Sequence, residues 1–509
     1  MNKSTDSSIH KKNILAQNTL INFFGQAIPL IFAVVAIPFV IDGLGTERFG
    51  VLTIVWIIIG YFGLFDMGIG RATTKFVADI EARGEQKLSP IIITSIVLLI
   101  TFGIIGSGLI ITLTPLIVKE VLNIPAELIG ETVNAFYVLS ISIPFVLGSV
   151  GARGALEAQQ KFALVNIIKI PASILNYVAP LLILPFSNSL HFIVIVLVVG
   201  RAATFFIYTY YCLKDESSTS LSDYPVLNWI KELMSFGAWI MVSNFISPLM
   251  VYMDRFILGA ILTMSAVAYY TTPYEVVTRL LIISGSFMGV MFPAFSAFSL
   301  ESNEKLARVH QKSIRYLVTA IVPLVIFVVI SAEPLLLLWL GNEFAVNSTR
   351  VLQLLAVGVL VNSVAMVPYT ALQAIGRPDI TAKLHMVELP IYLLMIWGFT
   401  IEMGIEGVAL AWVLRVTIDG AMLLYFFHRL VPFGEFQWGQ LINKLLAFTL
   451  TLMVMLLVYQ YLQNSYIIIL YACICSLIWA GLLWRWVLIE SDKNKIKDLL
   501  ANYSTLLKK

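Results

Sequence analysis

Uninterrupted runs of apolar residues follow one another along the chain from Ile14 to Ile489. Each run is long enough for an α-helix to cross a hydrocarbon core, which takes about 20 residues. The runs are continuous rather than alternating in polarity, and this pattern predicts membrane-spanning helices instead of the strands of a membrane barrel. We predict fourteen spans, at residues 14–41, 49–72, 91–114, 132–152, 163–184, 190–212, 232–258, 264–292, 314–340, 350–372, 384–402, 406–427, 441–462 and 465–488.

Composition and loop charge agree with an all-α polytopic membrane protein. Hydrophobic residues make up 59% of the 509 residues and charged residues 12%, against about 25% charged in soluble domains. The loops on the N-terminal side of the membrane hold 25 Lys and Arg residues, whereas the opposite loops hold only Arg48, Lys119 and Arg350. Positively charged loops stay in the cytoplasm, so both termini are predicted to be cytoplasmic.

The order of the segments predicts two similar halves. The sequence ALEA at 155–158 resembles ALQA at 371–374, and six predicted spans separate the two places. An even number of spans gives both halves the same orientation, as in transporters built from parallel repeats. The predicted parts are an N-terminal cytoplasmic tail (1–13), an N-lobe (14–212), a cytoplasmic linker (213–231), a C-lobe (232–428), two additional spans (441–488) and a C-terminal cytoplasmic tail (489–509).

Ionisable side chains within the spans are the main candidates for function. A charged group at the membrane centre costs roughly 2.5–3.5 kcal/mol on insertion scales, and such groups tend to face a water-filled cavity or a substrate path. Two adjacent spans between Ser235 and Pro293 hold four of them. The basic residues within spans are Lys169, Arg201, Arg255, Arg279 and Arg415, and the acidic residues are Asp66, Asp254, Glu275, Glu388 and Asp419.

Several of these residues share a helix face with amide side chains, because successive residues are about 100° apart around a helix. Lys169 falls on one stripe with Asn176, and Arg255 aligns with Asn244. Asn22 belongs to an uncharged polar stripe in the first span. These faces are predicted to point away from lipid.

A purely structural interpretation of the charges stays open. Glu275–Arg279 and Arg415–Asp419 are each spaced i, i+4, and residues at this spacing are neighbours on a helix surface. Each pair is therefore placed to neutralise itself and to hold the bundle together without any role in transport.

The sequence shows no pattern typical of an enzyme. It has no P-loop, zinc-binding HExxH or Ser-His-Asp arrangement in a plausible context, and its five histidines show no ligand spacing. Apart from residues 115–131, the predicted outer loops run only a few residues. We therefore predict no catalytic residue, no metal site and no bound cofactor.

A series of short motifs resembles a known family. The motifs are LGTERFG (44–50), FDMGIGRATTKFVADIEARGE (65–85), DRFILG (254–259), LQAIGRP (372–378) and GIEGVALAW (404–412). In this order and spacing they resemble the Wzx-type polysaccharide-unit flippases of bacteria, which belong to the multidrug/oligosaccharidyl-lipid/polysaccharide (MOP) superfamily. The resemblance covers about residues 13–430, and it implies two six-helix lobes that work by alternating access, with spans 13 and 14 added.

The resemblance also implies a substrate and a place. Such proteins move a lipid-linked oligosaccharide, typically on undecaprenyl pyrophosphate, from the cytoplasmic to the periplasmic leaflet of the bacterial inner membrane, for O-antigen, lipopolysaccharide or capsule synthesis. Cations and amides would bind the anionic headgroup and its sugars, so the substrate-binding candidates are Arg255, Arg279, Lys169, Arg201, Arg415, Asn22, Asn244 and Asn176. Candidates for coupling to H+ or Na+ are Asp66, Asp254, Glu275 and Asp419. Besides membrane lipids, a polysaccharide polymerase or chain-length regulator is a candidate partner, and nucleic acid is not.

Three alternatives differ in testable features. A cation-coupled multidrug and toxin exporter of the same superfamily predicts an acidic cavity, whereas five basic and five acidic residues lie within the spans here. A membrane-bound glycosyl enzyme predicts a substantial outer loop with catalytic groups. A scaffold for polysaccharide assembly would not need intramembrane charges.

We predict that Arg255→Ala and Arg279→Ala each abolish surface polysaccharide while the protein stays in the membrane, because each removes a cation from the predicted cavity. The measurement is polysaccharide display alongside immunoblots of the membrane fraction. Normal polymer from both variants would remove the two arginines from the mechanism.

Overall fold

The structure, a computed structural model, is almost entirely helical in the part of the chain that it describes. This part comprises residues 28–64, 66, 68–83, 88–214, 226–432, 455, 457–459, 461–488 and 490, and no strand occurs in these ranges. The prediction of an all-α fold is confirmed. Most of the predicted span 13 and both predicted tails lie outside the described residues.

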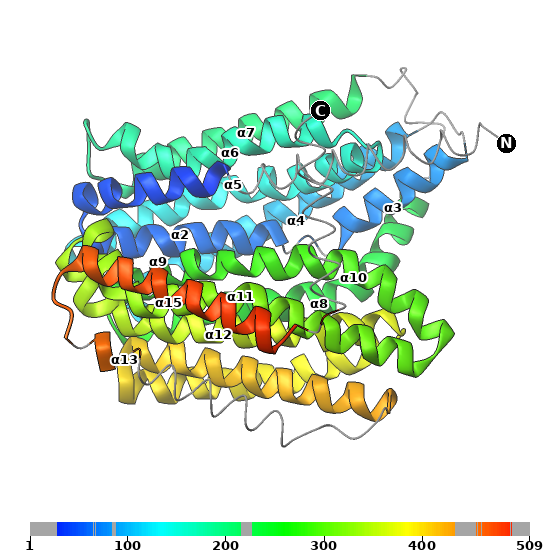
Figure 1. The fold of residues 1–509 in the computed structure, drawn as a ribbon. Coiled ribbons are helices and arrows are strands. Elements are labelled where there is room, and N and C mark those ends of the chain that lie inside the picture. The colour runs from blue at the N-terminus through cyan, green and yellow to red at the C-terminus, as the bar shows by residue number, and fades with distance from the viewer. Residues whose placement is uncertain are drawn as a thin grey trace, which may run out of the picture. The chain divides into compact units, whose positions relative to one another are not determined.

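The chain divides into two compact units, Met1–Ala268 and Tyr269–Lys509. The first described helix of the first unit spans Ile28–Leu44. Its other helices, several of which run side by side in Figure 1, are α2 (Thr46–Leu64), α3 (Ile69–Ala82), α4 (Ser89–Leu116), a π-helical turn (Ile117–Val121), α5 (Ala126–Ala158), α6 (Phe162–Ile183), α7 (Leu190–Leu213) and α8 (Val226–Ile261).

The second unit starts within α9 and holds the remaining helices. They are α9 (Met264–Val277), a 3-10 turn (Thr278–Leu280), α10 (Leu281–Glu301), α11 (Asn303–Leu340), α12 (Asn342–Ala374), α13 (Pro378–Leu430) and α15 (Ser465–Trp486). α15 packs along α11, where the Ser476 hydroxyl donates to the Pro323 carbonyl at 2.8 Å. The predicted span 14 is therefore an integral part of this unit.

Large apolar side chains remain exposed along the helices. In α4, Ile104 and Ile105 are 60% and 63% exposed, and Leu394 of α13 is 68% exposed. Surfaces of this kind suit a hydrocarbon solvent rather than water. Among the described residues, nine helices are long and apolar enough to cross a membrane. The protein is therefore a multi-span membrane protein, and the fourteen predicted spans fit this arrangement.

One predicted span is wrong in its extent. Residues 49–72 are predicted to form a single span, but α2 ends at Leu64 and α3 begins at Ile69. Asp66 lies in the break, where its carboxylate accepts hydrogen bonds from the Gly68 and Gly70 amides at 3.0 and 2.8 Å. An acidic side chain at this place satisfies amides that the first turn of a helix leaves unpaired.

The two glycines explain why the sequence DMGIG forms this break. Gly68 adopts a φ of 72°, a conformation that other residues adopt at a cost. A Cβ on Gly70 would lie 2.5 Å from the Asp66 carboxylate oxygen. Both positions therefore let Asp66 approach the start of α3, and this gives Asp66 a structural role.

α8 packs with the first unit, against α2, α3 and α4. The Asn123 backbone amide donates to the Gly259 carbonyl at 2.7 Å, and its side-chain amide donates to the Ala260 carbonyl at 2.9 Å. These carbonyls belong to the last turn of α8, where no intrahelical donor remains for them. The predicted lobe boundary within residues 213–231 stays a prediction.

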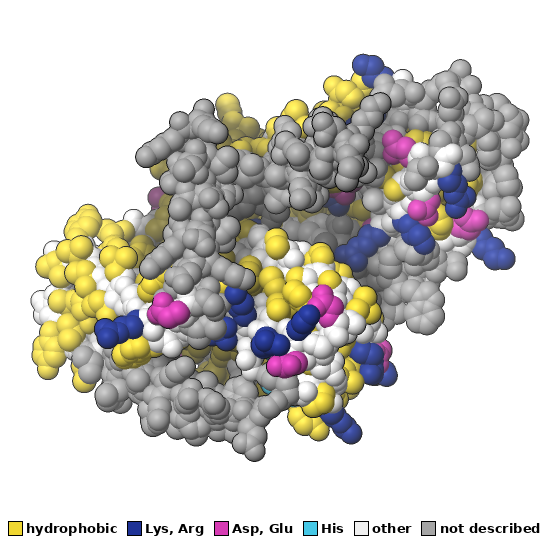
Figure 2. Space-filling view, turned by 45° about the vertical axis from the view of Figure 1, so that its right-hand side comes forward, with side chains coloured by type: hydrophobic (Ala, Val, Ile, Leu, Met, Phe, Trp, Pro, Cys, Tyr) yellow, Lys and Arg dark blue, Asp and Glu magenta, His cyan; other side chains and the backbone are white. Residues whose placement is uncertain are grey.

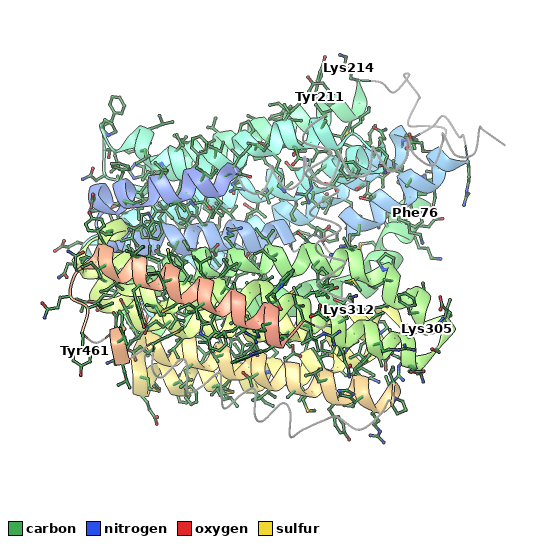
Figure 3. The ribbon with its side chains drawn as sticks, in the orientation of Figure 1. Phe76, Tyr211, Lys214, Lys305, Lys312 and Tyr461 are labelled. Carbon is green, nitrogen blue, oxygen red and sulfur yellow. The ribbon has the colours of Figure 1, made fainter. Side chains whose placement is uncertain are left out.

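Charged side chains mark helix ends that face water. Figure 2 shows Lys and Arg side chains interspersed with Asp and Glu on the described surface of the face it presents. Within the second unit, Lys305 lies at one end of the helices and Tyr461 at the other (Figure 3). Lys305 pairs with Glu301 at 2.6 Å and Arg308 with Glu304 at 3.3 Å, and all four side chains are exposed. Exposed i, i+4 pairs of this kind contribute little to stability.

We predict that Gly103→Ala lowers the stability of the first unit, because a Cβ there would lie 2.4 Å from the Pro144 Cα where α4 meets α5. Overpacking of this kind costs about 1–3 kcal/mol. The measurement is the melting temperature in detergent. Gly108→Ala on the same helix is the control, since a Cβ there meets nothing within 4 Å, and equal melting of the two variants would contradict the close approach.

Candidate functional site

The first unit holds a basic side chain that an amide, rather than a carboxylate, positions. Arg201 of α7 donates from Nη2 to the Asn176 Oδ1 of α6 at 2.9 Å. Among the described residues, Arg201 makes no ion pair, and its Nε has no hydrogen-bond partner. The Nε is therefore a buried donor that no described residue satisfies. Arg201 and Asn176 are both predicted as substrate-binding residues, and the structure brings them together.

Local packing of α6 on α7 sets this contact. Gly200 precedes Arg201, and a Cβ at Gly200 would lie 2.2 Å from the Leu175 Cδ2. The missing side chain lets the two helices approach closely at the level of Asn176. Pro171 and Pro180 lie within α6 on either side of this level, and prolines bend helices by removing a backbone donor.

The predicted polar stripe of α6 extends from this contact toward α5. Lys169 is only partly exposed and lies within electrostatic range of Arg153 and Glu157. Glu157 already pairs with Arg153 at 3.5 Å. The α6–α7 face thus carries two basic residues, Lys169 and Arg201. It is suited to bind a phosphate or pyrophosphate group, since guanidinium and ammonium groups both bind phosphate well.

Asp254 and Arg255 form a buried ion pair within α8. Their side chains are 1% and 0% exposed, and the Arg255 Nη1 lies 3.0 Å from the Asp254 Oδ1. The same nitrogen donates to the Val251 carbonyl, and the guanidinium lies 5.7 Å from the centre of the Tyr252 ring. The two residues are neighbours in sequence, yet their side chains bend toward each other. In this conformation Arg255 is a neutralised core residue of α8.

Glu275 and Arg279 form the other predicted pair of this region. The Arg279 Nη2 lies 3.1 Å from the Glu275 Oε2, and the side chains of Arg279 and Glu275 are 41% and 42% exposed. Arg279 sits in the 3-10 turn between α9 and α10. The pair matches the structural interpretation of the i, i+4 spacing, and its exposure leaves Arg279 accessible.

A second charged cluster lies in α13, which is two helical arms joined at Gly404. This glycine has φ 61° and ψ −138°, the one non-helical conformation within Pro378–Leu430. A Cβ on Gly407 would lie 2.1 Å from the Phe399 carbonyl oxygen. The two glycines thus allow a tight reversal between the predicted spans 11 and 12.

The reversal brings four ionisable side chains together across the two arms. Arg415 Nη1 lies 3.9 Å from the Glu388 Oε2, and His385 Nε2 lies 4.0 Å from the Asp419 Oδ1. Glu388 and Asp419 are each 8% exposed. The guanidinium of Arg415 lies 5.2 Å from the centre of the Tyr392 ring, where a cation–π attraction holds it.

This cluster corrects one interpretation of the sequence and adds a residue. The i, i+4 spacing of Arg415 and Asp419 predicts neutralisation on one helix, but in the described structure each pairs across to the other arm. His385 is absent from the predicted site because the five histidines share no common spacing. A signal was nevertheless present, since His385 and Glu388 are spaced i, i+3 on one helix face.

The cluster has the donor atoms for a small cation. One ligand atom each from His385, Glu388 and Asp419 lies within 4.8 Å of the others. The cluster brings two carboxylates, one imidazole and one guanidinium together. Both oxygens of Glu388 lack hydrogen-bond partners among the described residues. A proton or a monovalent cation would satisfy oxygens that are costly to leave bare.

The remaining predicted site residues do not gather at one place in the described structure. Asp66 caps α3. Asn22 lies outside the described residues, and the same holds for the side chain of Asn244. Within the described part of the chain, Asp419 is the one predicted coupling residue that shares a buried cluster with a second carboxylate.

Comparison with solved structures identifies the fold. The fold matches lipid II flippase MurJ in its inward closed conformation with a TM-score of 0.69 and 15% identity, over 92% of this chain and 99% of that chain. An inward-facing multidrug resistance MATE family transporter of the MOP superfamily matches with a TM-score of 0.68 and 15% identity, over 80% of this chain and 98% of that chain. The chain therefore shares the fold of these two proteins.

Comparison with known sequences defines the family. A family model described as "Polysaccharide biosynthesis protein" matches residues 44–349. A Shigella flexneri protein named "Putative O-antigen transporter" is 32% identical over 422 residues, which is 83% of this chain and 99% of that protein. The chain belongs to this polysaccharide biosynthesis protein family. The prediction of a transporter rather than an enzyme is confirmed by these relatives.

We predict that Arg255→Gln destabilises the protein, because it removes the guanidinium that lies 3.0 Å from the buried Asp254 carboxylate. Breaking a buried pair costs about 3–5 kcal/mol. The double variant Asp254→Asn/Arg255→Gln removes both charges and should regain most of the loss in melting temperature. If the double variant melts no higher than Arg255→Gln, the pair does not neutralise itself within α8. The comparison also separates misfolding from loss of transport at Arg255.

Proposed function

We propose that this protein moves a lipid-linked oligosaccharide, carried on undecaprenyl pyrophosphate, from the cytoplasmic to the outer leaflet of a bacterial inner membrane. The oligosaccharide is the repeat unit of a surface polysaccharide. Similarity to a Shigella flexneri protein named as a putative O-antigen transporter supports this class of substrate. Both termini lie in the cytoplasm, as the loop charges indicate.

The observation that carries the proposal is Arg201 with its amide partner. A guanidinium held by Asn176 stays available for a pyrophosphate, which it can bind with two parallel hydrogen bonds. Lys169 on the neighbouring helix adds a second positive charge. An exporter of hydrophobic cations would be expected to present carboxylates on such a face instead, which disfavours the multidrug alternative.

The cluster in α13 supplies the coupling step in this proposal. Asp419 and Glu388 bind H+ or Na+ between the two arms, with His385 as a third donor. Arg415 neutralises one carboxylate at 3.9 Å, so that the cluster holds only one further positive charge. Binding and release of that cation would bias the alternating access of two lobes, as in other transporters with parallel repeats.

We predict that Arg201→Gln lowers surface polysaccharide at least about tenfold, since a lost hydrogen bond to a charged group costs about 1.5–3 kcal/mol. Lipid-linked repeat units should accumulate on the cytoplasmic side. The measurement is polysaccharide display and extractable lipid-linked sugar in a strain that depends on the plasmid-borne gene.

The matched control is Arg308→Gln, which removes an exposed arginine from a surface pair with Glu304 and should leave polysaccharide unchanged. Membrane levels of both variants are compared by immunoblot. Full polysaccharide display by Arg201→Gln at equal membrane level would contradict the assignment of Arg201 to the substrate.

A further inference from the structure

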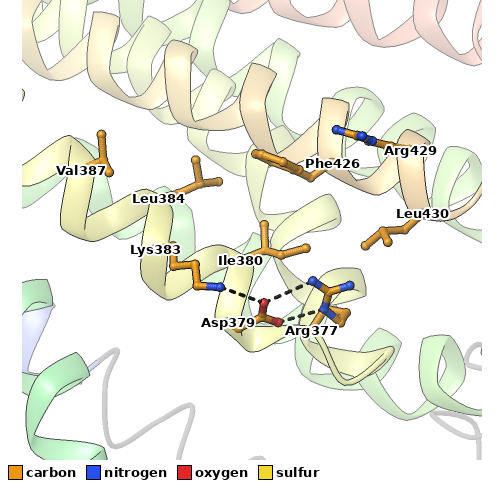
Figure 4. Close-up of a pocket in the computed structure, with 9 residues that line it drawn as sticks. All are labelled: Arg377, Asp379, Ile380, Lys383, Leu384, Val387, Phe426, Arg429 and Leu430. Carbon is orange, nitrogen blue, oxygen red and sulfur yellow. Dashed lines mark hydrogen bonds and ion pairs between the residues drawn. The ribbon is translucent and has the colours of Figure 1, made fainter.

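The described part of the second unit contains a groove between the two ends of α13. Its volume is about 500 Å³, and Figure 4 shows its lining side chains. The start of the first arm forms one wall, from Arg377 to Val387, and the end of the second arm forms the other, from Phe426 to Leu430. The groove therefore lies where the predicted span 11 begins and the predicted span 12 ends.

The mouth of the groove is positively charged. Arg377, Lys383 and Arg429 line it together with a single carboxylate, Asp379. Arg377 donates to both Asp379 oxygens at 2.9 and 3.2 Å, and the Lys383 Nζ lies 3.5 Å from Asp379. Arg429 makes no ion pair within the described residues. Three basic groups against one acidic group leave two net positive charges.

The inner wall of the groove is apolar and continues along the membrane span. Leu384, Val387 and Phe426 line it. Val387 is 61% exposed, and Ile391 and Leu394 on the same arm are 51% and 68% exposed. These three residues recur at i, i+4 and i+7, so they form one apolar stripe on a helix face. The stripe leads away from the charged mouth for about two turns.

A charged mouth followed by an apolar stripe matches a lipid molecule at a membrane boundary. The predicted spans begin at residue 384 and end at residue 427, so the cations lie where lipid phosphates lie. The positive-inside rule places this end in the cytoplasm, where anionic lipids attract basic side chains. The C-terminal tail at 489–509 is a poor alternative occupant, since its five Lys outnumber its three acidic residues.

We propose that this groove binds one anionic glycerophospholipid of the cytoplasmic leaflet. Its phosphodiester lies against Lys383 and Arg429, and one acyl chain follows the stripe from Leu384 past Val387 to Ile391. Arg377 donates two hydrogen bonds to Asp379 and so neutralises the carboxylate that also lies 3.5 Å from Lys383, which leaves the charges of Lys383 and Arg429 for the phosphate. The lipid thereby joins the two arms of α13 at their open end, opposite the reversal at Gly404. This site does not depend on which substrate the protein carries.

The test is lipid binding by native mass spectrometry of the purified full chain in detergent. Phosphatidylglycerol and phosphatidylcholine with identical acyl chains are titrated, and phosphatidylglycerol should bind more tightly. Lys383→Gln/Arg429→Gln should weaken phosphatidylglycerol binding about 30-fold, as expected for two lost cationic contacts, and leave phosphatidylcholine unchanged. The matched control, Lys305→Gln/Arg308→Gln, removes two exposed cations of α11 and should bind like the unmodified protein.

Further variants separate the site from general surface charge and from free anions. Val387→Gln places a polar group on the exposed stripe and should weaken phosphatidylglycerol binding. If Lys383→Gln/Arg429→Gln lowers the melting temperature of the protein, Arg429→Gln alone replaces it in the binding measurement. Inorganic phosphate at equal concentration should not displace the lipid. Three outcomes would each overturn the proposal. They are an equal loss of phosphatidylglycerol affinity in the α11 control, equal affinity for phosphatidylglycerol and phosphatidylcholine, and displacement of the lipid by inorganic phosphate.

Discussion

A charged side chain in hydrocarbon costs several kcal/mol unless it is paired or faces water, and the arrangement of this bundle follows from that constraint. The solutions differ from place to place. Asp254 and Arg255 form a buried ion pair within one helix. Arg415 and Glu388 meet across the two arms of α13. Arg201 is held by an amide instead, so its charge is oriented without being cancelled. Among the described residues it makes no ion pair, and in the proposed function it binds the anionic headgroup.

Glycine decides where helices come close enough for these contacts. Gly200 lets α6 approach α7 beside Arg201, and Gly407 lets the arms of α13 reverse beside Gly404. An added methyl group would overlap the Leu175 side chain at Gly200 and the Phe399 backbone carbonyl at Gly407, and at Gly407 the backbone itself would have to move. Close packing through small residues is a general device of membrane helices, because hydrocarbon provides no hydrophobic force to bring them together. Here the same device positions the groups proposed for substrate and cation.

The two charged sites lie in different compact units, and this division suits a transporter. The face of α6 and α7 in the first unit is basic, whereas the α13 cluster in the second unit holds two carboxylates and one guanidinium. A protein that takes an anionic headgroup in one part and a cation in another can couple the two only by a change of conformation. The family match and the MOP-type fold are consistent with such a change, and the phospholipid groove at the open end of α13 would act on the same element.

Continuous apolar runs in the sequence by themselves determined the helical membrane fold, because only helices satisfy every backbone group within a single span in lipid. The same runs made Lys169, Arg201, Arg255 and Arg415 conspicuous, and helical spacing placed Asn176 on a polar face. Ion pairs between different helices could not be predicted from residue spacing. Residue spacing specifies the face of a helix on which a side chain lies, but the neighbour it meets depends on how helices pack. Only the tertiary structure therefore decided that Arg415 pairs with Glu388 and not Asp419, that His385 joins the cluster, and that Asp66 caps a helix.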